Sequence, residues 1–103
     1  MRYQLAEQII RDMETLLDIS KDELTGYGRK AHISSCRKVA FALIRDKTIL
    51  TLSEIGELFN KNHKSVWEGI RTLNKLDPYY LDVYELLKDK DYGTSSENQS
   101  TML

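Results

Sequence analysis

Residues 51–73 read TLSEIGELFNKNHKSVWEGIRTL and contain two amphipathic segments separated by a short polar run. Thr51 and Glu54 form an S/T-x-x-E capping box, in which each side chain satisfies a backbone N–H left unpaired at the start of a helix. We therefore expect one helix to begin directly after Thr51 and to end at the polar residues 60–62. Apolar residues at helical spacing resume from Val66, which predicts a second helix. Two helices joined by a tight polar turn form a helix-turn-helix.

The flanking sequence predicts more helices and no strands. Apolar residues recur every three or four positions over residues 4–18, as in an amphipathic helix. Ser20 and Glu23 form a second capping box, and Asp77 followed by Pro78 is a typical start for a last helix. Because the sequence lacks the period-two alternation of strands, we predict an all-α bundle of about five helices.

A middle helix is expected to begin near Ser34 or Ser35, either of which could act as its N-cap. Its predicted buried stripe consists of Cys36, Val39, Ala40, Leu43 and Ile44, and its predicted exposed stripe consists of Arg37, Lys38 and Arg45. Residues 26–32 combine two glycines with Arg29 and Lys30, which predicts a positively charged loop. We expect Gly26 to close the preceding short helix in a left-handed conformation.

Length and composition are typical of one small domain. The 103 residues allow a single modest hydrophobic core. One cysteine excludes an internal disulfide, and the sequence has no apolar stretch long enough to cross a bilayer, so we expect a cytoplasmic protein with no membrane partner. We assign residues 1–90 to the folded domain and residues 91–103, which offer little to bury, to a flexible polar tail.

The charges are unevenly distributed along the chain. The formal net charge of −1 gives no overall indication of nucleic-acid binding. Residues 29–75, however, contain ten Lys or Arg against four Asp or Glu, a net charge of +6, which leaves −7 on the two flanks. A basic middle between acidic ends predicts one surface that faces phosphates. The alternative is that these charges only keep helix faces solvated.

Four segments combine glycine, basic and apolar residues in one order. They are Leu24-Thr25-Gly26-x-x-Arg29-Lys30, Arg37-Lys38-Val39-Ala40-Phe41-Ala42-Leu43, Leu52-Ser53-Glu54-Ile55-Gly56-x-x-Phe59 and His63-Lys64-Ser65-Val66. Together they resemble the C-terminal DNA-binding domain of the bacterial replication initiator DnaA. The resemblance covers roughly residues 16–73 and implies a helix-turn-helix of the Trp-repressor type. It also implies double-stranded DNA as the partner, with a recognition helix in the major groove and a basic loop in the neighbouring minor groove.

The resemblance, together with the charge pattern, leads to a hypothesis of sequence-specific binding to double-stranded DNA near the nucleoid. The predicted readers of base edges in the major groove are Asn62, His63, Lys64 and Ser65. The predicted minor-groove residues are Arg29 and Lys30, since a narrow groove attracts a guanidinium group. The predicted phosphate contacts are Arg37, Lys38, Arg45, Lys61 and Arg71.

The turn before His63 departs from the family's pattern. The family has two glycines followed by Arg-Asp at this place, whereas this chain has Asn60-Lys61-Asn62, one residue fewer. Asn62 replaces an acid that would accept from a cytosine amino group, and an asparagine instead favours a bidentate contact with adenine. Lys64 replaces a threonine. We therefore predict that this chain prefers a DNA sequence different from the family's own site.

The sequence predicts binding without catalysis. The ATPase domain of the initiator requires a G-x-x-x-x-G-K-[ST] phosphate loop, which is absent here, so we expect no nucleotide and no cofactor. No nucleophile, base and orienting group occur at a recognisable spacing either. The expected role is a module in replication or transcription control, either stand-alone, as in a mobile element or phage, or an expressed fragment.

Other interpretations of single residues stay open. Trp67 could stack on a base, but packing or a dimer contact is the commoner role of such a residue. His32 and Cys36 at i, i+4 are too few ligands for a metal site, so no metal is expected. The alternative function is a protein-interaction adaptor that does not bind DNA. In it the acidic, Tyr-rich residues 77–90 and the exposed part of Trp67 would contact a partner protein or a second copy of the chain.

Overall fold

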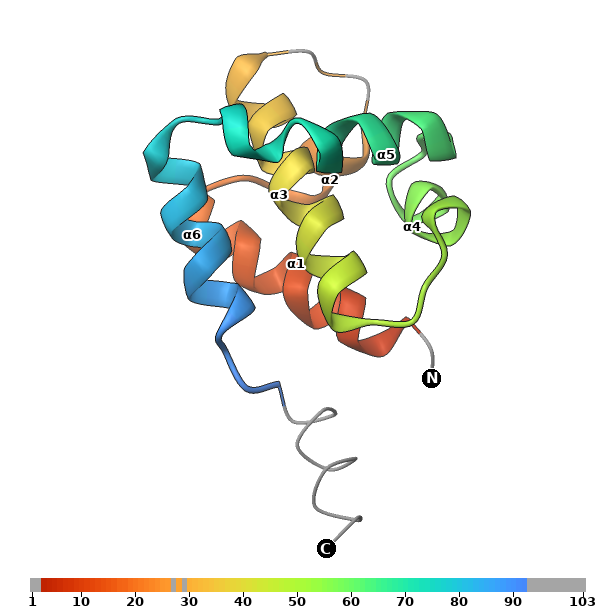
Figure 1. Cartoon of the computed structure of the whole chain (residues 1–103), viewed down its shortest axis with the longest axis horizontal. Helices are drawn as coiled ribbons and strands as arrows, with labels where there is room; N and C mark the ends of the chain where they lie inside the picture. Colours follow the sequence, from red (N-terminus) through yellow and green to blue (C-terminus); the bar gives the residue numbers. More distant parts are fainter. Residues whose placement is uncertain (1–2, 27, 29, 93–103) are drawn as a thin grey trace, which may run out of the picture.

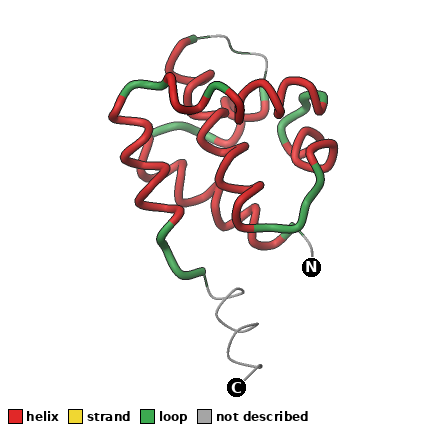
Figure 2. Tube along the Cα trace, in the orientation of Figure 1, coloured by secondary structure: helices red, strands yellow, loops and turns green. Residues whose placement is uncertain are grey.

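The computed structural model describes residues 3–26, 28 and 30–92, and these residues form helices with no strand (Figure 1, Figure 2). The helices are α1 Gln4–Leu17, α2 Lys21–Thr25, α3 Ala31–Lys47, α4 Leu52–Leu58, α5 His63–Arg71 and α6 Pro78–Lys88, with a 3-10 turn at Leu73–Lys75. The predicted all-α bundle is confirmed, and the pair α4 and α5 forms the predicted helix-turn-helix.

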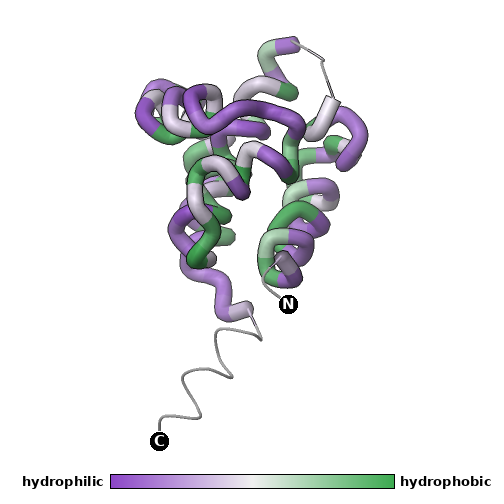
Figure 3. The backbone as a smooth tube through the Cα atoms, turned by 90° about the vertical axis from the view of Figure 1, so that its right-hand side faces the viewer, coloured by the Kyte–Doolittle hydropathy of each residue, from purple (hydrophilic) through white to green (hydrophobic). Residues whose placement is uncertain are grey.

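The central helix is α3, which contacts each of the other five α-helices. Figure 1 shows α5 running across α3, with α6 and α4 on either side of it. The middle of α3 is buried, and it packs with fully buried side chains from its neighbours, among them Ile9, Met13, Ile55, Phe59 and Val66. The rings of Phe41 and Phe59 meet edge to face, 5.2 Å between centroids. Hydrophobic and hydrophilic residues alternate along the helices, as expected for elements that pack through one face (Figure 3).

Both predicted capping boxes are confirmed. The Thr51 hydroxyl accepts from the backbone N–H of Glu54 at 3.1 Å, and the Thr51 N–H donates to the Glu54 carboxylate at 2.8 Å. Ser20 and Glu23 make the equivalent pair of bonds at the start of α2. Pro78 is the first residue of α6 as predicted, although the Asp77 side chain makes no capping hydrogen bond. Capping boxes therefore mark the starts of α4 and α2, and Pro78 marks the start of α6.

The start of α3 and the end of α2 differ from the prediction. α3 begins at Ala31, so Ser34 and Ser35 lie inside the helix rather than at its N-cap. Tertiary contacts hold this first turn, because His32 hydrogen-bonds through Nε2 to the Leu17 carbonyl at 3.0 Å and through Nδ1 to the Tyr80 hydroxyl at 2.8 Å. Gly26 ends α2 in an extended conformation with φ −91°, not a left-handed one. A glycine is still needed there, since a Cβ would lie 2.8 Å from the Asp22 carbonyl oxygen.

The folded part of the chain extends beyond the predicted boundary at residue 90. Tyr92 is buried, and its hydroxyl donates to Asp12 of α1 at 2.7 Å. Lys90 also pairs with Asp12, at 2.7 Å. The rest of the predicted tail, residues 93–103, lies outside the described residues. In α1 the predicted apolar stripe is buried except for Leu16, which is 40% exposed.

Candidate nucleic-acid interface

The turn between α4 and α5 is short and closely packed. The Lys61 N–H donates to the Gly56 carbonyl at 2.9 Å, which folds the turn back over α4. Position 56 has no room for a side chain, because a Cβ there would collide with the Lys61 carbonyl oxygen. Asn60 takes a left-handed conformation with φ 57°, which asparagine tolerates better than most residues. The three residues Asn60-Lys61-Asn62 therefore complete the turn without the family's two glycines.

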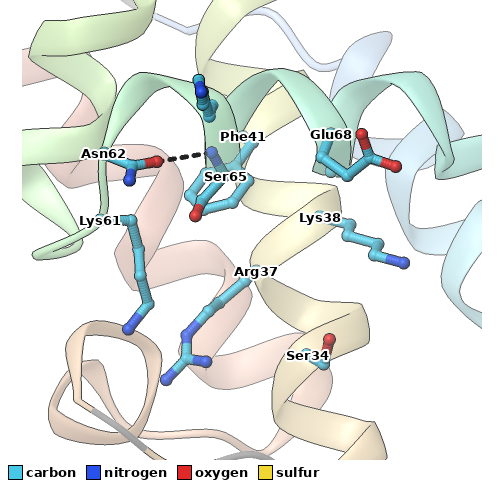
Figure 4. Close-up of a pocket in the computed structure, with 10 residues that line it drawn as sticks. Ser34, Arg37, Lys38, Phe41, Lys61, Asn62, Ser65 and Glu68 are labelled. Atoms are coloured by element: carbon cyan, nitrogen blue, oxygen red, sulfur yellow. Dashed lines mark hydrogen bonds between the residues drawn. The ribbon is translucent and has the colours of Figure 1, made fainter.

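Asn62 is the N-cap of α5. Its side-chain oxygen accepts from the Ser65 backbone N–H at 2.9 Å (Figure 4). A bidentate contact with adenine requires both amide atoms of an asparagine, and this oxygen already caps the helix. The capping bond uses one of the two lone pairs of this oxygen and leaves the NH₂ group outside it, and the predicted bidentate contact of Asn62 stays a prediction.

The exposed face of α5 carries alternating charges. Lys64, Glu68 and Arg71 are spaced i, i+4 and i+7, so they lie on one side of the helix, opposite the buried Val66 and Gly69. Arg71 pairs with Glu68 at 2.5 Å, and both side chains are more than half exposed. His63 and Ser65, in the first turn, are also exposed. The residues predicted to read the major groove are thus exposed to solvent.

A cleft of about 510 Å³ separates this first turn of α5 from α3. Its lining residues are Ser34, Arg37, Lys38, Phe41, Lys61, Asn62, Lys64, Ser65, Glu68 and Gly69. Of the charged residues in this lining, four are basic and one, Glu68, is acidic. At this cleft Gly69 lets α5 approach α3 closely, since a Cβ at Gly69 would lie 2.8 Å from the Phe41 ring. Four cations in one cleft make it attractive to an anion.

Arg37 does not lie on an exposed face, so that expectation is wrong. The residue is 9% exposed. Its guanidinium donates to four carbonyl oxygens at the end of α2 and in the following loop, those of Glu23, Leu24, Gly26 and Gly28, at 2.7 to 3.0 Å. Burial lowers the pKa of Arg37 from its ordinary value, but a guanidinium keeps its charge. The carbonyl oxygens at the end of a helix have no intrahelical partner, and Arg37 satisfies them here.

The turn of the helix-turn-helix bonds to the same segment. The Lys61 ammonium donates to the Gly26 carbonyl at 2.8 Å, and the Asn60 side-chain amide donates to the Thr25 carbonyl at 3.0 Å. Figure 4 shows Lys61 and Arg37 extending towards the same loop from two different elements. This arrangement fixes the start of α5 relative to the end of α2.

The remaining predicted contacts are distributed over α3 and the loop before it. Lys30 is the exposed N-cap residue of α3. Lys38 is half-buried and lines the cleft, whereas Arg45 is exposed near the far end of α3 and does not line it. Arg29, predicted for the minor groove, lies outside the described residues. Four further residues line the cleft that were not predicted as site residues: Ser34, Phe41, Glu68 and Gly69. For Gly69 a signal existed in the sequence, since it lies three residues after Val66 on the buried stripe.

His32 and Cys36 lie one turn apart on α3, with the Cys36 Sγ 3.7 Å from the His32 Nε2. Among the described residues no three His, Cys, Asp or Glu side chains come close enough to hold a metal ion. Burial raises the pKa of the Cys36 thiol to about 11. A search of the described helices for one long and apolar enough to span a membrane found none.

Comparisons with known proteins agree with this arrangement. The pattern of the family described as "Bacterial dnaA protein helix-turn-helix" matches residues 6–73. The chain is 38% identical over 76 residues to the chromosomal replication initiator protein DnaA of Oleidesulfovibrio alaskensis, covering 70% of this chain and 16% of that protein. It is 34% identical over 82 residues to the DnaA of Thermus thermophilus, covering 79% and 19%. It is 32% identical over 98 residues to the DnaA of Nostoc punctiforme, covering 91% and 21%.

The chain therefore spans about a fifth of the length of these relatives or less. No solved structure matches it. The matched residues 6–73 run from α1 through α5, so they include the buried arginine, the turn and the exposed helix face described above. By this match, and by the similarity to the initiator proteins, the chain belongs to the bacterial DnaA helix-turn-helix family.

Proposed function

We propose that this chain binds double-stranded DNA, with α5 in the major groove. The observation that carries the proposal is the exposed, charged face of α5 beside a cleft whose charged residues are mainly basic. An α-helix fits the major groove, and the second helix of a helix-turn-helix presents its first residues to base edges. Membership of a DnaA helix-turn-helix family supports the same role.

We divide the proposed contacts into those with base edges, those with phosphates and those in the minor groove. We assign base contacts to His63, Lys64 and Ser65, and a weaker one to the Asn62 amide. We assign phosphate contacts to Lys38, Arg45, Lys61 and Arg71, and minor-groove contacts to Arg29 and Lys30. We do not assign a phosphate contact to Arg37, because its guanidinium already donates to backbone carbonyls. Its proposed role is to hold the end of α2 and the loop that follows in place.

Salt dependence tests the proposal directly. Neutralising about four phosphates should give a slope of log affinity against log salt of about −3 to −4. Fluorescence anisotropy with a labelled random-sequence duplex at several salt concentrations measures this slope. Lys38→Gln should weaken all duplexes alike and reduce the slope by about one, whereas Lys64→Gln should change their ranking. Lys88→Gln on α6 is the matched control and should change neither. Absence of binding, or binding that salt does not weaken, would refute the proposal.

We further propose that this binding serves replication or transcription control, without catalysis, in the compartment that holds the DNA. The relatives are named chromosomal replication initiator proteins, but the chain corresponds to a small part of them. Identifying the bound genomic sites by chromatin immunoprecipitation distinguishes the two processes. Sites clustered at a replication origin support the first, and sites in promoters support the second.

A protein contact is the second candidate function, and a groove between α1 and α6 favours it. The groove measures about 550 Å³, and two of its lining residues are the exposed Leu16 and Leu86, 40% and 60% accessible. Asp82 and Asp89 lie on the same side of α6 as Leu86, at i−4 and i+3. An apolar groove with acidic neighbours fits a basic amphipathic helix of a partner protein. A second copy fits less well, because a symmetric contact would place these acids against each other.

A designed peptide pair tests this second candidate. A Leu/Lys amphipathic helix should bind the chain, whereas a Leu/Glu helix with the same apolar stripe should not. Leu86→Ser should abolish peptide binding and leave DNA binding unchanged. Equal binding of both peptides, or no effect of Leu86→Ser, would contradict a groove-specific contact. A doubled mass in solution that Leu86→Ser abolishes would instead assign the groove to a homodimer.

A further inference from the structure

We propose that Glu68 is a specificity-determining residue that reads the exocyclic amino group of a cytosine in the major groove. This inference rests on the proposed binding of double-stranded DNA. Glu68 is the sixth residue of α5 and its one acidic residue. It lies on the outward side of the helix, one turn after Lys64, so a helix lying in the groove would present it to the bases.

The geometry keeps the Glu68 carboxylate both oriented and accessible. Arg71 binds one carboxylate oxygen, Oε2, through Nη2 at 2.5 Å. The other oxygen, Oε1, is outside this contact, and the side chain is 57% exposed. The nearby Thr72 hydroxyl donates to the backbone carbonyl of Glu68 at 2.8 Å rather than to its carboxylate. Figure 4 shows the carboxylate projecting from α5 on the side where Lys38 projects from α3.

A structural role explains this acid poorly. Ion pairs between exposed side chains three residues apart on a helix contribute little to stability. Within the cleft lining Glu68 is the one acid among basic residues, where a carboxylate weakens attraction to phosphate. An acid on a surface that faces DNA therefore lowers affinity for every duplex, unless a base offers it a hydrogen-bond donor.

Chemistry selects the base. A carboxylate only accepts hydrogen bonds, and the donors in the major groove are the amino groups of cytosine and adenine. Adenine also presents its N7 acceptor beside the amino group, which repels a carboxylate, whereas the cytosine edge presents the amino donor alone. Cytosine is therefore the base that fits Glu68, and the other base pairs are disfavoured at that position.

Selection from a random-sequence duplex library tests the inference with three proteins: the unchanged chain, Glu68→Gln and Glu85→Gln. Glu85 is exposed on α6, so its replacement makes the same change in net charge away from α5. The unchanged chain should select a site with a required cytosine at one position. Glu68→Gln should lower that preference about five- to tenfold and shift it towards adenine, which glutamine recognises. It should also raise the affinity for unrelated duplexes, because the carboxylate no longer repels their phosphates. Glu85→Gln should leave the selected site unchanged.

The outcomes separate this inference from the proposed function. If the unchanged chain selects a site and Glu68→Gln selects the same site with the same preferences, DNA binding stands and the inference is overturned. A uniform rise in affinity of Glu68→Gln for all duplexes, with no change in ranking, also overturns it, because Glu68 would then only repel phosphates. If the unchanged chain binds no duplex, the proposed function falls and the inference falls with it.

Discussion

Arg37 and Lys61 donate hydrogen bonds to the same carbonyl oxygen, that of Gly26, at 2.7 and 2.8 Å. Arg37 comes from α3, and Lys61 comes from the turn between α4 and α5. Two like charges converge here because the carbonyl oxygens at the end of α2 carry partial negative charge and lack helical partners. The three elements that form the proposed interface are thus held together by side chains that bind backbone.

Replacing Arg37 tests whether it is a structural residue. Arg37→Ala removes hydrogen bonds to four carbonyl oxygens, of which only that of Gly26 keeps its bond from Lys61, so we expect it to destabilise the fold by about 2–4 kcal/mol. Arg37→Lys should recover only part of this, because an ammonium lacks the planar fork. Urea unfolding followed by circular dichroism measures both variants. Arg45→Ala, at an exposed position of the same helix, should change stability by less than about 0.5 kcal/mol. Unchanged stability of Arg37→Ala together with weaker DNA binding would restore the phosphate role predicted from sequence.

The shortened turn depends on Asn60 in two ways that different substitutions separate. Its left-handed backbone favours asparagine or glycine, and its side chain donates to the Thr25 carbonyl. Asn60→Gly keeps the backbone conformation and loses the bond, so it should cost about 1 kcal/mol or less. Asn60→Ala loses both and should cost about 1 kcal/mol more. Equal unfolding free energies for the two variants would show that the backbone conformation contributes nothing.

The sequence predicted the elements that local signals determine. The capping boxes and the proline of α6 depend on neighbouring residues and lie where they were expected, and the apolar stripe of α1 is buried except for Leu16. Arg37 was predicted to be exposed, but it lies one residue after the buried Cys36, at the edge of the buried stripe of α3. The carbonyls that bind its guanidinium come from residues 23–28, which helical spacing on α3 does not predict. The start of α3 depends on His32 contacts with α1 and α6, which no local pattern reveals.

In the candidate site, too, the sequence predicted the features that depend on neighbouring residues and missed those that depend on tertiary packing. The exposure of Lys64 and Ser65 follows from helical spacing after Val66. The capping role of Asn62 follows from its place before a helix, but the resemblance to the family led to a prediction of base contact instead. The cleft between α3 and α5 depends on how closely the two helices pack, as at Gly69 and Phe41, and this tertiary contact has no local sequence signal.

The stability of the fold should depend on acid through Asp12. Burial raises the pKa of Asp12, but hydrogen bonds from Lys90 and Tyr92 lower it more, so it lies below the ordinary 3.8. A depressed folded pKa gives stabilisation that is present above about pH 4 and is lost as pH falls through the folded value. Asp12→Asn should therefore flatten the decline of the urea midpoint below about pH 4. A variant with the same acid dependence as the unchanged chain would contradict this role of Asp12.

Tyr92 should produce the complementary alkaline dependence. Burial first, and then the bond to Asp12, raise the pKa of Tyr92 above its ordinary value of 10.0. A raised folded pKa gives stabilisation that is complete below about pH 10 and is lost as pH rises beyond it. Tyr92→Phe should lessen the decline of stability between about pH 10 and 12, measured by the same unfolding experiment. An unaltered alkaline decline would assign it to other groups, among them Tyr84, whose pKa is also raised by burial and by Asp46.

Gly69→Ala tests the close approach of α5 to α3. In most helices alanine is more favourable than glycine by about 1 kcal/mol. Here the new Cβ would lie 2.8 Å from the Phe41 ring and 3.3 Å from the Lys38 side chain, so either the Phe41 ring or the helices must shift. Overpacking costs about 1–3 kcal/mol, and we expect a net loss of stability of about 1 kcal/mol and weaker DNA binding.

The double variant supplies the control for this last prediction. Phe41→Leu removes the ring edge that meets the new Cβ, and Gly69→Ala should then become neutral or stabilising. The difference between the two backgrounds is the coupling energy, which should be about 1–2 kcal/mol for residues in contact. A Gly69→Ala variant that is more stable than the unchanged chain would show that Phe41 moves aside freely. The spacing of α3 and α5, and the cleft between them, would then not depend on this glycine.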